Sequence, residues 1–122
     1  MTRRFLSLLA GWFMMIVPAQ AAAPLVIDAS ILVEDAPNAT KQFVGYVTAH
    51  QPLEGRYELT GEKIGVAGNA RVKQAGAIKA APHQAVRLSH IAFGSIAADD
   101  HYSVQLKIFR GNELVGHAEI IK

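Results

Sequence analysis

Histidine is the residue type in this chain with the widest range of chemistry, because an imidazole can bind a metal ion or carry a proton near neutral pH. The 122-residue sequence contains five histidines: His50, His83, His90, His101 and His117. A metal site needs several ligands that converge with tight geometry. No two of these histidines form an H-x-H or H-x-x-x-H pair, and most lie near the ends of expected strands. The pattern therefore predicts neither a metal centre nor a cofactor.

Other catalytic arrangements are also missing from the sequence. There is no G-x-S-x-G or H-E-x-x-H motif, no phosphate-binding glycine loop between a strand and a helix, and no cysteine nucleophile. The pair Asp99–Asp100 could contact a cation, but without further ligand-like spacing it is more typical of a solvated turn. We therefore expect a protein that is not an enzyme.

Basic side chains give the strongest signal of a binding surface. Five of them fall in the expected third to fifth strands, mostly at outward positions: Arg56, Arg71, Lys73, Lys79 and Arg87. If these strands are neighbours, the five side chains form a basic stripe. Lys and Arg on exposed strands also prevent edge-to-edge aggregation. Two interpretations therefore stay open: protection of an edge, and a contact stripe for an extended polar or acidic chain.

The N-terminal segment has the features of a secretory signal peptide. A short basic start precedes an apolar run of 13 residues, 5–17, and an A-x-A site then ends at Ala21. The run is well short of the ~20 residues needed to span a bilayer. We predict export to the periplasm and cleavage after Ala21, or alternatively after Ala23. The first choice gives a signal peptide of residues 1–21 and one domain of residues 22–122.

Removal of the predicted signal peptide changes the charge balance. Of the 12 Lys and Arg residues, Arg3 and Arg4 lie in that segment, and the ten that remain are matched by ten Asp and Glu residues. A domain without formal net charge is not typical of nucleic-acid-binding proteins. The chain has no cysteine, so a domain of about 100 residues must be held together by its hydrophobic core alone.

Period-2 alternation of apolar residues dominates the predicted domain, and no segment shows a helical stripe. Pro52 and Gly55 interrupt the alternation, and other turns contain Gly, Pro or Asn. Evenly spaced strands joined by such turns predict an all-β fold, a seven-stranded immunoglobulin-like antiparallel sandwich. Tyr102 is either the tyrosine corner of such a sandwich or an ordinary strand aromatic. The expected strands are residues 25–33, 41–50, 56–62, 69–79, 86–93, 101–110 and 113–121.

The segment GVAGNARVKQAG, residues 65–76, mixes Gly, Ala, Asn and Gln like the repeat of an amyloid fibre. Only one copy is present, whereas stacking architectures need several. Arg71 and Lys73 would also stack like charges in an in-register fibre, which is strongly disfavoured. We therefore interpret residues 65–68 as a hairpin turn and the residues from Asn69 onward as a charged strand face.

Three segments resemble the CsgC/CsgH family of curli-assembly proteins, and are closer to its CsgH branch. They are GRYELTGEKIGVAGNARVKQAG, VRLSHIAFGSIAADDHYSVQLKIF and GNELVGHAEI. The resemblance covers most of the chain after the predicted signal peptide. It rests on the strand pattern, the size, the R-Y-x-L strand, the D-D-x-Y-x-V segment and the final hairpin.

The resemblance implies a periplasmic immunoglobulin-like sandwich that keeps the major curli subunit from forming amyloid before export. We also expect a monomer without membrane contact, because no stretch after Val17 is long and apolar enough to span a bilayer. The charged strand face could meet an unfolded, Gln/Asn-rich chain without offering it a flat edge to extend. The CsgC branch carries a Cys-x-Cys motif near the position of residues 53–55, which lack cysteine here. Redox chemistry therefore does not carry over.

Two other functions stay open on the residues. One is an immunoglobulin-like structural or adhesion module of a surface assembly. The other is a periplasmic metal carrier that uses the histidines.

Overall fold

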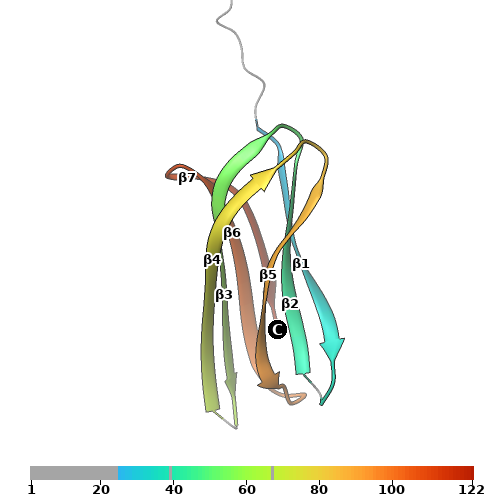
Figure 1. Ribbon diagram of the computed structural model, residues 1–122. Coiled ribbons are helices and arrows are strands. Elements are labelled where there is room, and N and C mark those ends of the chain that lie inside the picture. The colour runs from blue at the N-terminus through green and yellow to red at the C-terminus, as the bar shows by residue number, and fades with distance from the viewer. Residues whose placement is uncertain (1–24, 39, 67) are drawn as a thin grey trace, which may run out of the picture.

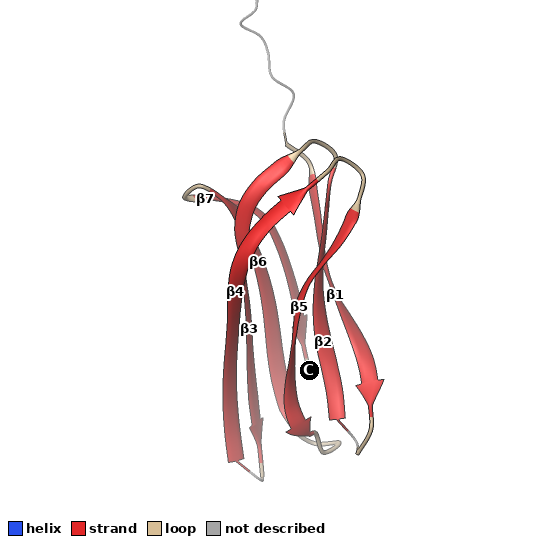
Figure 2. Cartoon of the chain, in the orientation of Figure 1, coloured by secondary structure: helices blue, strands red, loops and turns tan. Residues whose placement is uncertain are grey.

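Strands account for most of the described structure. The computed structural model describes residues 25–38, 40–66 and 68–122, and the predicted signal peptide lies outside these ranges. These residues form seven strands and no helix (Figure 2), so none of them forms a helix that could cross a membrane. The strands are β1 (Ile27–Ala36), β2 (Thr40–Ala49), β3 (Leu53–Gly65), β4 (Gly68–Ala80), β5 (Ala85–Ser95), β6 (His101–Arg110) and β7 (Glu113–Ile121).

The strands form two antiparallel sheets that lie against each other (Figure 1). One sheet has the strand order β1-β2-β5, and the other has the order β4-β3-β6-β7. The predicted seven-stranded immunoglobulin-like sandwich is thereby confirmed. β4 lies beside β3 because a tight hairpin joins them: Gly65 pairs with Gly68, and Gly68 has a φ of 123°, which glycine adopts without strain.

The hydrophobic core lies between the sheets and is built from the inward side chains of the alternating pattern. Phe43 of β2, Leu59 of β3 and Leu106 of β6 are completely buried there. The ring centroid of Phe43 lies 5.7 Å from that of Phe93 and 5.1 Å from that of Tyr102. Burial of each such side chain stabilises the fold by about 1.5–3 kcal/mol, which compensates for the absence of disulfides.

Tyr102 is a strand aromatic and not a tyrosine corner. Its ring packs on Phe43, and its main chain exchanges hydrogen bonds of 3.2 and 2.9 Å with Lys122. A tyrosine corner would instead send the hydroxyl back to the main chain a few residues upstream. In the part of the chain that the structure describes, the Tyr102 hydroxyl makes no such hydrogen bond.

β5 departs from the predicted alternation. Strict alternation along the predicted strand 86–93 would place Leu88 and His90 on one face and Ile91 on the other. In the structure Leu88 packs against the core, His90 is exposed and Ile91 is buried. The pairing with β2 shifts between Val44 and Tyr46, where a β-bulge adds one residue to β5. Because side chains alternate with a period of two, the extra residue exchanges the inward and outward positions that follow.

Four strands are longer than predicted, and two of them, β3 and β1, continue through residues outside the expected strands. Gly55 was expected to interrupt the pattern but lies inside β3. The residue at this position must be glycine because a Cβ would overlap the carbonyl oxygen of Phe109 in β6. Glycine here marks the close approach of two strands and not a turn. β1 likewise continues past residue 33, where the expected strand ends, since its pairing with β2 holds as far as Ala36 and Thr40.

A buried ion pair fastens the end of β3 to the corner between β5 and β6. Lys63 is 7% exposed, and its Nζ donates to the carbonyl of Ser95 at 2.9 Å and lies 3.7 Å from the Asp100 carboxylate. That carboxylate also accepts the main-chain N–H of Ala97 at 2.9 Å. Asp100 is only 4% exposed. The prediction of a solvated Asp99–Asp100 turn is therefore wrong for Asp100, whose charge compensates Lys63 inside the protein.

We expect Asp100→Ala to lower the free energy of unfolding by about 3–5 kcal/mol, because it leaves Lys63 buried without its counter-charge. Urea denaturation, monitored by far-UV circular dichroism of the backbone, measures the change in the free energy of unfolding. Asp99→Ala is the matched control, since Asp99 is exposed and such substitutions usually change stability by about 0.5 kcal/mol or less. Equal stability of the two variants would show that the buried pair does not hold the corner.

Candidate functional site

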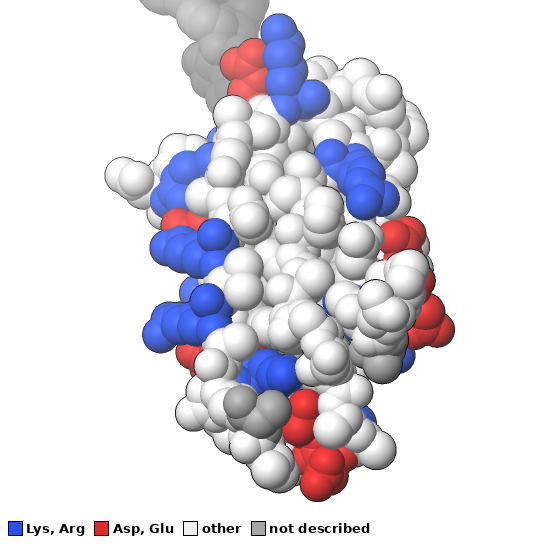
Figure 3. Space-filling model, turned by 60° about the horizontal axis from the view of Figure 1, so that its bottom comes forward, with Lys and Arg blue, Asp and Glu red and all other residues white. Residues whose placement is uncertain are grey.

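The outer face of the four-stranded sheet collects most of the predicted contact residues. Alternation along β4 turns its three cations to this face, and the register with β3 and β6 places Arg56 and Lys107 on the same side. Lys107 was not predicted, because the sequence does not show that β6 lies beside β3. We call this surface the basic sheet face; its cations are Arg56, Arg71, Lys73, Lys79 and Lys107. Figure 3 shows Lys and Arg side chains in a column along one side of the molecule, with acidic atoms between them.

Arg87 does not belong to the basic sheet face. It lies on β5 in the other sheet, paired in register with Tyr46, and its guanidinium donates to the Tyr46 hydroxyl at 3.5 Å. The predicted stripe of five residues therefore divides into four that share a sheet face and one that lies apart. The alternating pattern predicted an outward direction for most of these residues, but it could not show which strands pair.

The opposite sheet carries a separate ion pair at the β1–β2 hairpin. Lys41 Nζ donates to Asp35 Oδ1 at 2.9 Å, and both side chains are exposed. This hydrogen bond, followed by the charge of Asp35, raises the pKa of Lys41 above its ordinary value.

Carboxylates of β3 interleave the cations of the basic sheet face. Arg71 Nε lies 3.4 Å from Glu62 and Lys73 Nζ lies 3.9 Å from Glu58. Arg56 donates to the same Glu58 at 2.9 Å. The Arg71 and Lys73 side chains are nevertheless 75% and 60% exposed, so each keeps a solvent-facing side on which a second carboxylate can bind.

A polar hollow lies in the middle of the basic sheet face and crosses β4, β3 and β6. Its volume is about 220 Å³. Three of its lining residues are cations and one is a carboxylate, so it suits anionic or polar groups. The lining residues are Glu58, Thr60, Arg71, Lys73, Gln105 and Lys107.

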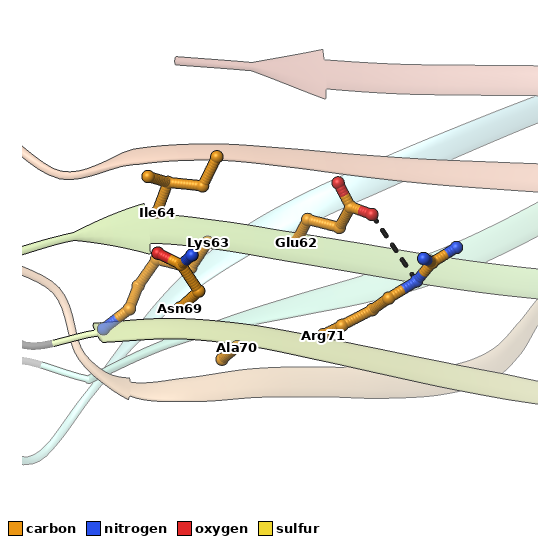
Figure 4. A pocket seen from close by; sticks show the side chains of 6 residues that line it. All are labelled: Glu62, Lys63, Ile64, Asn69, Ala70 and Arg71. Atoms are coloured by element: carbon orange, nitrogen blue, oxygen red, sulfur yellow. Dashed lines mark ion pairs between the residues drawn. The ribbon is translucent and has the colours of Figure 1, made fainter.

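A second hollow of about 270 Å³ lies beside the β3–β4 hairpin, next to the Arg71–Glu62 ion pair (Figure 4). Ile64 extends from β3 at this end, and it is exposed, as are Val66 at the hairpin and Ile121 of β7. The basic sheet face thus ends in an apolar area. Charged and apolar side chains therefore lie close together at this end of the sheet.

The histidines do not form a metal site within the described residues, where no three His, Asp or Glu side chains are grouped to hold an ion. The fold does bring two of them together: the ring centroids of His50 and His83 are 5.0 Å apart, and His50 Nε2 lies 3.0 Å from Asp28. Sequence spacing could not reveal this cluster, because its members come from three separate turns and strands. His101 instead lies 3.3 Å from the carbonyl of Lys122.

Comparison with known proteins identifies the family to which this chain belongs. The model of the CsgH protein family matches residues 35–119 of this chain. No curated protein sequence matches it.

Two solved structures share the fold. The solution structure of CsgH from R. palustris has a TM-score of 0.62 and 23% identity, with 79% of this chain and 92% of that chain covered. The E. coli curli protein CsgC has a TM-score of 0.63 and 16% identity, with 78% and 96% covered. At these identities the likeness shows the fold alone. The family match, in contrast, spans well over half of the sequence, and the chain therefore belongs to the CsgH family, within the CsgC/CsgH group of curli-assembly proteins.

Proposed function

We propose that this protein is a periplasmic chaperone-like inhibitor that holds a curli-type amyloid subunit in a non-amyloid state before export. The observation that carries the proposal is the exposed pair Arg71 and Lys73, which lies on a continuous sheet face of a protein from a curli-assembly family. The polar hollow between these cations and Lys107 extends the contact area. Export to the periplasm is supported by the predicted signal peptide at residues 1–21.

The ion pairs of the basic sheet face favour weak and rapidly exchanging contacts with a client. Arg71–Glu62 and Lys73–Glu58 are exposed pairs at 3.4 and 3.9 Å, and such pairs contribute roughly 0–1 kcal/mol. A client carboxylate or amide can therefore join or replace the internal partner at little cost in free energy. Electrostatic attraction also speeds the encounter with a polar, unfolded chain. A protein that binds and releases quickly can act on many client molecules.

The proposed activity needs contact only. It requires no catalytic group, no bound cofactor and no nucleic acid, and a monomer is sufficient because the basic sheet face is complete within one chain.

We expect the purified protein, added at well below one molecule per client, to lengthen the lag before a curli-type subunit forms fibrils. Thioflavin fluorescence of the subunit, with and without the protein, measures the lag. An inert β-sandwich of similar size at the same concentration controls for crowding. An unchanged lag would reject the inhibitor and favour a structural or adhesion module.

We expect the double variant Arg71→Glu with Lys73→Glu to lose most of the effect on the lag. Reversal replaces attraction of client carboxylates by repulsion, while the fold should stay within about 1 kcal/mol of the wild type because both pairs are exposed. Lag times and thermal melting of the same samples test both statements.

Arg87→Glu compared with Lys73→Glu provides the matched control. Each substitution changes one charge by the same amount, but Arg87 lies on the other sheet. If Arg87→Glu weakens inhibition as much as Lys73→Glu, net charge and not the basic sheet face determines the activity.

A further inference from the structure

The sandwich has four edge strands, and β4 has the longest and most regular edge. All 13 residues of β4 pair with β3 without a register shift. The pairings of β5 and β7 each contain a shift, and bulges of this kind spoil an edge for further pairing. β1 is regular but shorter, with ten residues, and its exposed charges are the carboxylates Asp28 and Asp35.

The middle of β4 projects beyond the opposing sheet. Gln74 lies opposite Leu59, on the core side of β4, yet it is exposed, and its neighbour Val72 on that side is only partly buried. The opposing sheet is one strand narrower. Only the C-terminal end of β4, at Ile78 and Ala80, is covered. Within the described residues, no strand pairs with the outer edge of β4.

We infer that the outer edge of β4 over residues 69–75 accepts an extended segment of the amyloid-forming client as an added strand. The inference rests on the function proposed above and specifies how the client is held. Main-chain hydrogen bonds to the unpaired N–H and C=O groups of β4 supply the contact, as in other cases in which a peptide adds a strand to an open sheet edge.

Charge on β4 selects the side chains of the added segment. A residue directly beside Arg71 or Lys73 on the same face would lie about 4.5–5.5 Å away between Cβ atoms. Glu62 and Glu58 of β3 already lie on one side of these cations. A carboxylate or an amide of the client, on the open-edge side of β4, therefore completes a row of alternating charge across the strands. Alanines at positions 70, 75 and 77 leave room for the larger side chains of the segment.

A second copy of this chain is the less favourable occupant. Pairing of two β4 edges would bring a second Arg71, Lys73 and Lys79 to one sheet face, and like charges on adjacent strands destabilise the pair. A client segment of Gln, Asn, Gly and acidic residues meets no such repulsion. The same cations therefore oppose self-association and favour the client.

Addition to β4 prevents fibril growth because it occupies one of the two edges of the client segment. A growing fibre needs both edges free for in-register stacking. On the β4 side of the client segment no further client strand can add, because β4 is already paired with β3 in a folded sheet.

Hydrogen exchange tests the added strand directly. The ¹⁵N-labelled protein is mixed with an excess of a soluble synthetic peptide that contains one curli-subunit repeat. We expect exchange to slow by about tenfold at alternate amides of residues 69–75, since only every second N–H points away from β3. The β1 edge in the same sample is the internal control. Unchanged exchange in β4, or equal protection of β1, would overturn the inference.

Proline substitution separates main-chain pairing from charge. Gln74→Pro and Ala75→Pro lie next to each other, so one removes an N–H that pairs with β3 and the other removes one that points outward. We expect only the first to lower the melting temperature strongly. The proline variant that keeps its melting temperature should inhibit less. The lag of the subunit in its presence should be at least threefold shorter than in the presence of the wild type, although Arg71 and Lys73 are intact. Gln74→Ala and Ala75→Ser, which keep the N–H, should behave as the wild type.

The outcomes distinguish the two proposals. If the stable proline variant delays fibrils as well as the wild type, the added strand is wrong and the inhibitor function stands. If the wild type itself does not delay fibrils, the proposed function fails. Loss of inhibition in the stable proline variant, together with alternate-amide protection, supports both.

Discussion

The register between β3 and β4 is the constraint on which the rest of this structure depends. Thirteen consecutive residue pairs fix it, and a slip of one residue would turn every β4 side chain to the opposite side of the sheet. Arg71 and Lys73 would then point toward the core, and Val72 and Ile78 toward solvent. The buried Lys63–Asp100 pair anchors the hairpin end of β3, the strand against which β4 aligns, to the corner between β5 and β6.

Alternation along the chain predicted the seven strands and the outward direction of most of the predicted contact residues, because both depend on local order. It could not predict features set by contacts between distant segments. The bulge in β5 turns Ile91 into the core. The carbonyl of Phe109 leaves no room for a side chain at Gly55, and the buried charge of Lys63 is compensated by Asp100. Each of these depends on a neighbour that the sequence alone does not name.

The candidate site was also predictable only where it depends on local order. Arg56, Arg71, Lys73 and Lys79 share a face because their strands are joined by a tight hairpin, which the glycines at 65 and 68 indicate. Arg87 was wrongly grouped with them and Lys107 was missed, since both depend on sheet order. That the basic strand is also an edge strand follows only from this order, and it is the basis for our inference that the charges select a partner as well as protect the edge.

The surplus strand of the four-stranded sheet has a consequence for how such a protein can evolve. Residues 69–75 contribute no completely buried side chain, so most substitutions there leave the core unchanged. Under the proposed strand addition, preference for one fibre-forming chain over another can therefore drift, or be redesigned, largely independently of thermal stability. In most small domains these two properties compete for the same residues; here residues 69–75 of β4 lie apart from the buried Ile78 and Ala80 of the same strand.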